Sequence, residues 1–127
     1  MDSRASIIPS LQYRDAAAAI EWLCSAFGFE KMLVVPGKDS KIAHSRLTLG
    51  SGMVMVQSAG EDEVKPTRFG ICVVVEDADS HYARAKAAGA EIVAELEDYH
   101  FGGRGYSCRD VEGFLWTFST HDPWAPL

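Results

Sequence analysis

Several residue patterns that define common protein classes are scarce in this sequence. The chain of 127 residues has only three cysteines, Cys24, Cys72 and Cys108, which form neither a CxxC pair nor another zinc-binding pattern. Their odd number and wide spacing argue against a disulfide-stapled scaffold. We therefore expect three reduced thiols that pack mostly as small buried hydrophobes.

Runs of positive charge and long apolar runs are missing as well. The chain has 12 Lys and Arg residues against 18 Asp and Glu residues, a net charge of -6, which opposes non-specific binding to nucleic acid. The longest apolar run, residues 71–75, is far shorter than the roughly 20 residues of a membrane-spanning helix. The first ten residues do not resemble a signal peptide. We expect a cytoplasmic protein whose partners include neither nucleic acid nor a membrane.

The remaining composition is that of an ordinary globular protein. Hydrophobic residues make up 47% of the chain and charged residues 24%, which is typical of a soluble fold. A chain of this length can bury roughly two thirds of the surface that its unfolded form exposes. The sequence therefore predicts one domain, or two half-domains that share a core.

The first half of the chain reads as a strand, a helix and three further strands. Apolar and alternating segments predict strands in residues 7–13, 29–35, 42–50 and 53–57. Asp15 can cap a helix whose apolar residues recur at helical spacing, and Gly28 can end it.

The second half repeats this order. Strands are predicted in residues 69–75, 90–96, 104–109 and 114–118. Asp77 can cap the helix that follows the first of these strands, and Gly89 can end it. Residues 110–113 read as a hairpin turn.

The two halves also share residues at equivalent positions, and this internal repeat predicts the fold. Segments 14–16 and 26–30 align with segments 76–78 and 87–91 through one single-residue gap. We predict an α+β fold in which residues 1–127 form one domain of two tandem βαβββ modules. The modules span about residues 5–57 and 69–120, with a polar linker at 58–68 and a tail at 121–127. Paired modules would form a half-closed mixed sheet with a central cleft, where ligands usually bind.

Four segments of the chain resemble a known superfamily. They are YRDAAAAIEWLCSAFGFE (13–30), KIAHSRLTLGSGMVMV (41–56), VEDADSHYARAKAAGAEI (75–92) and FGGRGYSCRDVEGFLWTF (101–118). In these segments the chain resembles the vicinal oxygen chelate superfamily, the group of glyoxalases, bleomycin-resistance proteins and extradiol dioxygenases. The last segment is similar to the family pattern YGxRxYxxRDPEGHxWxF, with Phe101, Val111 and Phe114 at the Tyr, Pro and His positions. The resemblance is specific for the fold and weak for function, because the superfamily hosts many chemistries.

The resemblance also implies where a metal ion would bind. Metal-using members place a His or Gln on the first strand of each half and a Glu or similar ligand on a later strand. Carried onto this sequence, the positions fall at Ile8, Arg46, Gly70 and Thr117. Divalent metals prefer imidazole, thiolate or carboxylate ligands, and a guanidinium repels a cation, so we expect neither a metal nor another cofactor. A shift of the alignment by two residues would offer His44.

Strand alternation provides a test of this placement. If the four positions face one side of the sheet, so do their neighbours two residues away, namely Ser10, Gln12, His44, Thr48, Cys72, Val74, Leu115 and Ser119. The opposite side then carries Ile7, Leu11, Ala43, Leu47, Ile71, Val73, Trp116 and Phe118. The second set is apolar and suits packing beneath helices, whereas the first is mixed and suits a ligand-binding face.

The predicted ligand-binding residues are Gln12, His44, Arg46, Thr48, Arg104, Tyr106 and Thr117. Arg46 could pair with an anionic or carbonyl group of a ligand, or with a carboxylate of the protein itself. His44 is the candidate catalytic base, with a hydrogen-bonded structural histidine as the alternative. Arg104 and Tyr106 match the family pattern in a glycine-rich turn. His81, on the second predicted helix, is expected to face solvent.

These observations lead to three functional hypotheses. The first, which we favour, is metal-independent binding of a small molecule such as an antibiotic, and the same resemblance implies a homodimer. The second is a metal-dependent lyase, isomerase or dioxygenase of the same superfamily. The third is a metal-free enzyme in which His44 removes a proton and Arg46 holds the resulting oxyanion. Whether the protein is an enzyme therefore stays open at the level of the sequence.

Overall fold

The structure is a computed structural model that describes residues 5, 7–60 and 70–124. In these residues the chain forms two helices and eight strands, divided between two compact units, Met1–Lys65 and Pro66–Leu127. Each unit has the order strand, helix and three strands, which confirms the predicted α+β fold of two βαβββ modules. Most of the predicted linker and the start of the predicted strand at 69–75 lie outside the described residues.

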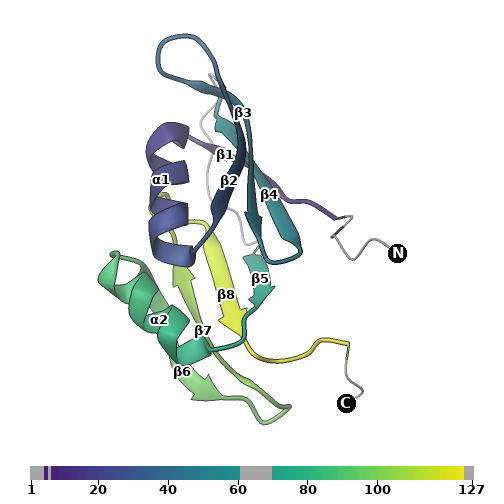
Figure 1. Ribbon diagram of the computed structural model, residues 1–127. Coiled ribbons are helices and arrows are strands. Elements are labelled where there is room, and N and C mark those ends of the chain that lie inside the picture. The colour runs from purple at the N-terminus through teal and green to yellow at the C-terminus, as the bar shows by residue number, and fades with distance from the viewer. Residues whose placement is uncertain (1–4, 6, 61–69, 125–127) are drawn as a thin grey trace. The chain divides into compact units, whose positions relative to one another are not determined.

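Unit 1 is a four-stranded mixed sheet with one helix on it. Its elements are β1 (Ser10–Tyr13), α1 (Ala16–Phe27), β2 (Glu30–Pro36), β3 (Ile42–Leu49) and β4 (Gly52–Ser58). The strand order is β1-β4-β3-β2, with β1 parallel to β4 and the remaining pairs antiparallel. Helix α1 contacts β1, β3 and β4 and covers one face of the sheet (Figure 1).

Unit 2 has the same topology. Its elements are β5 (Gly70–Val74), α2 (Ala78–Ala87), β6 (Glu91–Asp98), β7 (Arg104–Arg109) and β8 (Leu115–Ser119). The strand order is β5-β8-β7-β6, and again only the first and last strands of the unit pair in parallel. Helix α2 contacts β6, β7 and β8 (Figure 1).

The helices begin where the sequence predicts. The Asp15 carboxylate accepts a hydrogen bond from the Ala18 backbone N–H at 3.1 Å, and Asp77 accepts one from the Ser80 N–H at the same distance. Such caps satisfy a backbone donor that the first helical turn leaves unpaired. Gly28 ends α1 with a φ of 88°, a left-handed conformation that glycine adopts without steric cost.

The hairpin turn between β7 and β8 is held by one buried carboxylate. Asp110 accepts hydrogen bonds of 3.0 Å from the backbone N–H groups of Glu112 and Phe114 and from the indole Nε1 of Trp116. Asp110 and Trp116 are both buried. This arrangement gives the RDVEGFLWTF segment a structural role, because the carboxylate fixes the turn and the indole fixes the start of β8.

Each sheet has a face beneath its own helix and an opposite face, which we call the open face of that unit. Leu11 and Leu47 are buried beneath α1, whereas the alternating neighbours Gln12 and Arg46 are exposed on the open face. In β8 the buried residues are Trp116 and Phe118, with half-buried residues between them. The predicted alternation is therefore confirmed in β1, β3 and β8. Ile7 and Ala43 are exceptions in the predicted apolar set, because both are exposed.

Candidate functional site

The strand register defines which described side chains lie on the open face of unit 1. The strand register places cross-strand partners on the same side of a sheet. On β3, Arg46 lies between Leu33 of β2 and Met55 of β4. The same register extends the face to Ser10, Gln12, Glu30, Leu33, Val35, His44, Arg46, Thr48, Met53, Met55 and Gln57, with Glu30 across from Thr48. The predicted residues Gln12, His44, Arg46 and Thr48 therefore share one face.

Arg46 and His44 form a hydrogen-bonded pair at the middle of this face. The guanidinium Nε of Arg46 donates to the imidazole Nε2 of His44 at 3.1 Å. Arginine has donors only, so Nε2 must act as the acceptor and the imidazole proton sits on Nδ1 in this pair. The sequence leaves a salt bridge to a carboxylate as one alternative for Arg46, but no carboxylate among the described residues pairs with it.

The surroundings of the pair are apolar on both sides. Leu33 and Val35 are each 39% exposed, although they are large apolar residues, and Met53 and Met55 are half-buried. A polar contact closes the β1 side of the face, where the Gln57 side-chain amide donates to the Ser10 hydroxyl at 2.9 Å. The face thus combines one fixed cation with a floor of flexible thioethers and branched aliphatic groups.

Strand pairing corrects one of the four positions that the resemblance implies for a metal. The first strand of each unit pairs with the fourth, so that Ser10 lies opposite Met55 and Cys72 lies opposite Thr117. The unit 1 counterpart of Thr117 is therefore Met55. Arg46 lies one strand further away, directly across from Met55. The sequence placed this position on the wrong strand because both strands of a hairpin show the same alternation.

The corrected set still does not fit a divalent metal. Ile8 and Gly70 offer no side-chain ligand atom, and the thioether of Met55 is a soft ligand that suits Cu(I). The Thr117 hydroxyl is engaged with the Ser107 hydroxyl at 2.7 Å. Among the described residues, no group of three or more His, Cys, Asp or Glu side chains could hold a metal ion.

Thr117 lies on the open face of unit 2, which differs in chemistry from that of unit 1. Its neighbours there include Cys72, which pairs across from it on β5 and is exposed, and Ser107 on β7. Arg109 lies on the same face, across from Leu115, and its Nη1 donates to the Gly113 carbonyl oxygen at 3.0 Å. The exposure of Cys72 also contradicts the expectation of three mostly buried thiols, since Cys24 is half-buried and only Cys108 is buried.

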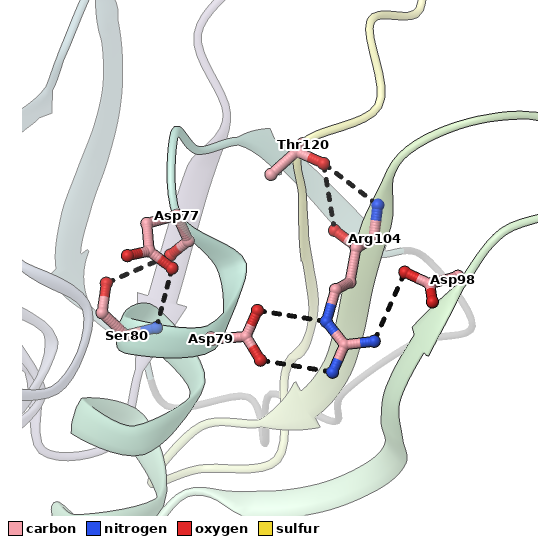
Figure 2. A network of polar contacts seen from close by, with 6 residues as sticks. All are labelled: Asp77, Asp79, Ser80, Asp98, Arg104 and Thr120. Atoms are coloured by element: carbon pink, nitrogen blue, oxygen red, sulfur yellow. Dashed lines mark hydrogen bonds and ion pairs between the residues drawn. The ribbon is translucent and has the colours of Figure 1, made fainter.

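Arg104 lies on the helix side of unit 2 and is held by two carboxylates. Its Nε and Nη2 donate to the two oxygens of Asp79 at 3.1 and 3.2 Å, and its Nη1 donates to Asp98 at 3.4 Å. Figure 2 shows the guanidinium between these two residues, one at the start of α2 and one at the end of β6. The Arg104 backbone also pairs with the Thr120 hydroxyl, which ties the ends of β7 and β8 together. Arg104 therefore does not share a face with Thr117.

Tyr106 is buried beneath α2 and is likewise not on the open face. Its hydroxyl lies 2.6 Å from Nδ1 of His81, and its ring stacks on Phe118. Burial raises the pKa of Tyr106 well above its ordinary value. The prediction that His81 faces solvent is wrong, because its ring is half-buried against Phe118 with centroids 4.0 Å apart.

The sequence reasoning did not identify the apolar half of the unit 1 open face. Met53 and Met55 alternate with the buried Val54 and Val56 in the segment MVMVQ. That alternation was the available signal, because it assigns both methionines to the side opposite the helix. The same alternation assigns Gln57 to the side of Met53 and Met55.

Comparison with known proteins assigns the fold to a family. The family model of the Glyoxalase/Bleomycin resistance protein/Dioxygenase superfamily matches residues 7–118, and the chain belongs to this superfamily. Uncharacterized proteins of Mycobacterium bovis and Mycobacterium tuberculosis are 34% identical to it over 122 residues. These matches cover 88% of this chain and 80% and 72% of the two relatives.

Solved structures with the same fold include both similar and distant sequences. TioX from Micromonospora sp. ML1 is 37% identical, with a TM-score of 0.79 over 93% of this chain and 99% of that chain. The fosfomycin resistance protein FosX from Listeria monocytogenes is 19% identical, with a TM-score of 0.76 over 97% of each chain. Lactoylglutathione lyase from Agrobacterium tumefaciens is 17% identical, with a TM-score of 0.71 over 96% of this chain and 97% of that chain. The last two share the fold alone.

Neither of the two described helices is a candidate membrane span. In the part of the chain that the structure describes, no helix is both long and apolar enough to cross a bilayer.

Proposed function

We propose that the protein binds a small organic molecule on the open face of unit 1 without the help of a metal ion. The observation that carries this proposal is the Arg46–His44 pair, which stands among apolar side chains and has no described carboxylate partner. Ligand sites are typically apolar surfaces with a few placed polar groups that set orientation. This face has that composition.

The side chains at the familial metal positions support metal independence. Ile8, Met55, Gly70 and Thr117 do not form a donor set for a divalent cation. Arg46 lies directly across from Met55, so its positive charge would repel a cation held at that position. Sequestration of an antibiotic by a cytoplasmic homodimer is the biological use that the family resemblance suggests for such a protein.

A metal-free enzyme is the second candidate, and the geometry of His44 favours it over metal-dependent chemistry. A neutral imidazole beside a guanidinium could remove a proton from a bound molecule while the guanidinium stabilises the oxyanion. The acceptor nitrogen Nε2 is occupied by Arg46 in the structure, so a base role would require the pair to separate. A binding protein needs no such rearrangement.

The experiment that tests the proposed function is a fragment screen by NMR in the presence of a chelator. With labelled methyl groups, ligands should shift the signals of Met53 and Met55 and leave Leu23, which is buried in α1, unchanged. Turnover of the bound molecule would favour the enzyme instead. Binding that disappears with the chelator and returns with a divalent metal would contradict the proposal.

A further inference from the structure

Arg46 differs from Arg104 and Lys31, which pair with carboxylates. Arg104 is held by two carboxylates, and Lys31 pairs with Glu21. Arg46 is exposed on a sheet face, and its partner is the neutral acceptor nitrogen of His44. No described carboxylate pairs with its positive charge, so the guanidinium is available to an anionic group of a ligand.

The hydrogen bond to His44 also decides which edge of the guanidinium is available. Because Nε is engaged, the terminal Nη1 and Nη2 nitrogens form the edge that remains, and no described residue accepts from them. This edge presents two parallel N–H donors, which match the two oxygens of a carboxylate. An arginine side chain that rotates freely loses conformational entropy when it binds a ligand. A guanidinium that a hydrogen bond already holds in place loses less. His44 is thus a positioning residue for Arg46.

The side chains beside Arg46 indicate the chemistry of the part of the ligand that contacts them. Leu33 and Met55 flank it on the neighbouring strands, and Val35 lies across from His44. These side chains offer apolar contact area next to the charged fork. Since the whole protein carries a net charge of -6, long-range electrostatics do not attract anions, and selectivity has to come from this local geometry.

We infer that the ligand of the unit 1 open face is an organic anion, in which a carboxylate meets the outer edge of Arg46 and an apolar body lies on the neighbouring side chains. This inference rests on the proposed function and narrows it to one chemical class. It also assigns His44 the task of aiming Arg46.

The test compares two probes, naphthalene carboxylate and the matching naphthalene carboxamide, which share one ring system and differ in charge. The wild-type protein should bind the carboxylate about tenfold or more tightly than the carboxamide. The carboxylate should also shift the nitrogen NMR signal of Arg46 and the methyl signals of Met53 and Met55. Equal affinity for the two probes would overturn the inference.

Variants separate charge, geometry and positioning. Arg46→Met should erase the preference for the carboxylate, and Arg46→Lys should keep only part of it because lysine lacks the fork. His44→Phe should weaken carboxylate binding, and His44→Gln, which keeps an acceptor, should restore most of it. As a control, Lys38→Met removes one positive charge, as Arg46→Met does, but at an exposed turn. It should leave the preference for the carboxylate intact. A preference that survives in Arg46→Met would overturn the inference.

The outcomes also separate this inference from the proposed function. If both probes shift Met53 and Met55 equally, the face binds small molecules and the ligand class is wrong. If neither probe nor any fragment shifts these two signals, the inference and the proposed function both fail.

Discussion

The two sides of the unit 2 sheet place two thiols in opposite environments. Cys108 is buried beneath α2, and this burial raises its pKa to about 12. Cys72 lies on the open face and is exposed. Only the thiolate reacts with alkylating agents, so environment decides which of the two can react.

We therefore predict different labelling of these cysteines. At mildly alkaline pH, iodoacetamide should modify Cys72 in the folded protein, whereas Cys108 should react only after unfolding. Its raised pKa keeps the Cys108 thiol protonated until the pH approaches about 12. Peptide mass spectrometry after timed labelling measures both rates. Similar labelling rates for Cys72 and Cys108 would mean that one of these side chains lies on the other side of the sheet, through a reversed orientation of β5 or β7.

The strand register shows which of the candidate site residues share a face. The shared face of His44 and Arg46 followed from their spacing of two along one strand. Arg104 and Tyr106 were chosen from a family pattern without asking which face they occupy. Tyr106 pairs with Phe118, a residue already assigned to the apolar face, so alternation places Tyr106 on the helix side as well. The ligand-binding roles of the remaining candidates stay predictions.

At the scale of elements, local sequence signals were sufficient for the helices and strands. Asp15, Asp77 and Gly28 mark helix ends through backbone chemistry that does not depend on the rest of the fold. The pairing partner of each strand is a long-range property, and it was not visible. That is why Arg46 was placed where the structure has Met55.

The hairpin turn offers a prediction about stability. Asp110→Ala would leave the Trp116 indole N–H and two backbone N–H groups without their acceptor. The free energy of unfolding should fall by roughly 1–3 kcal/mol, the usual cost of one unsatisfied buried donor, or by more if none of the three finds water. Urea denaturation monitored by tryptophan fluorescence measures the change.

Two variants control this prediction. Asp110→Asn keeps one carbonyl oxygen and should lose less stability than Asp110→Ala. Asp122→Ala removes an exposed carboxylate that accepts a hydrogen bond from the Trp124 N–H, and the variant should stay within about 0.5 kcal/mol of wild type. An Asp110→Ala protein as stable as Asp122→Ala would show that the turn does not depend on its carboxylate.

At the scale of the whole molecule, one topology occurs twice with two different open faces. Unit 1 presents Arg46, His44 and methionines, whereas unit 2 presents Thr117 and Cys72. Sequence similarity and the fold place the chain in a superfamily that hosts several chemistries, so function has to be argued from these side chains. On that argument we propose that the protein recognises its ligand through a guanidinium and apolar groups, where metal-using relatives would employ a metal ion.

Metal content is the measurement that tests this account most directly. The protein would be purified without chelator, incubated in turn with nickel, zinc, manganese and iron(II), desalted and submitted to elemental analysis. Because Ile8, Met55, Gly70 and Thr117 do not form a donor set for a divalent ion, we predict far less than one equivalent of each metal. One tightly held equivalent per chain would contradict metal-independent binding and would direct attention to the enzymes of the superfamily.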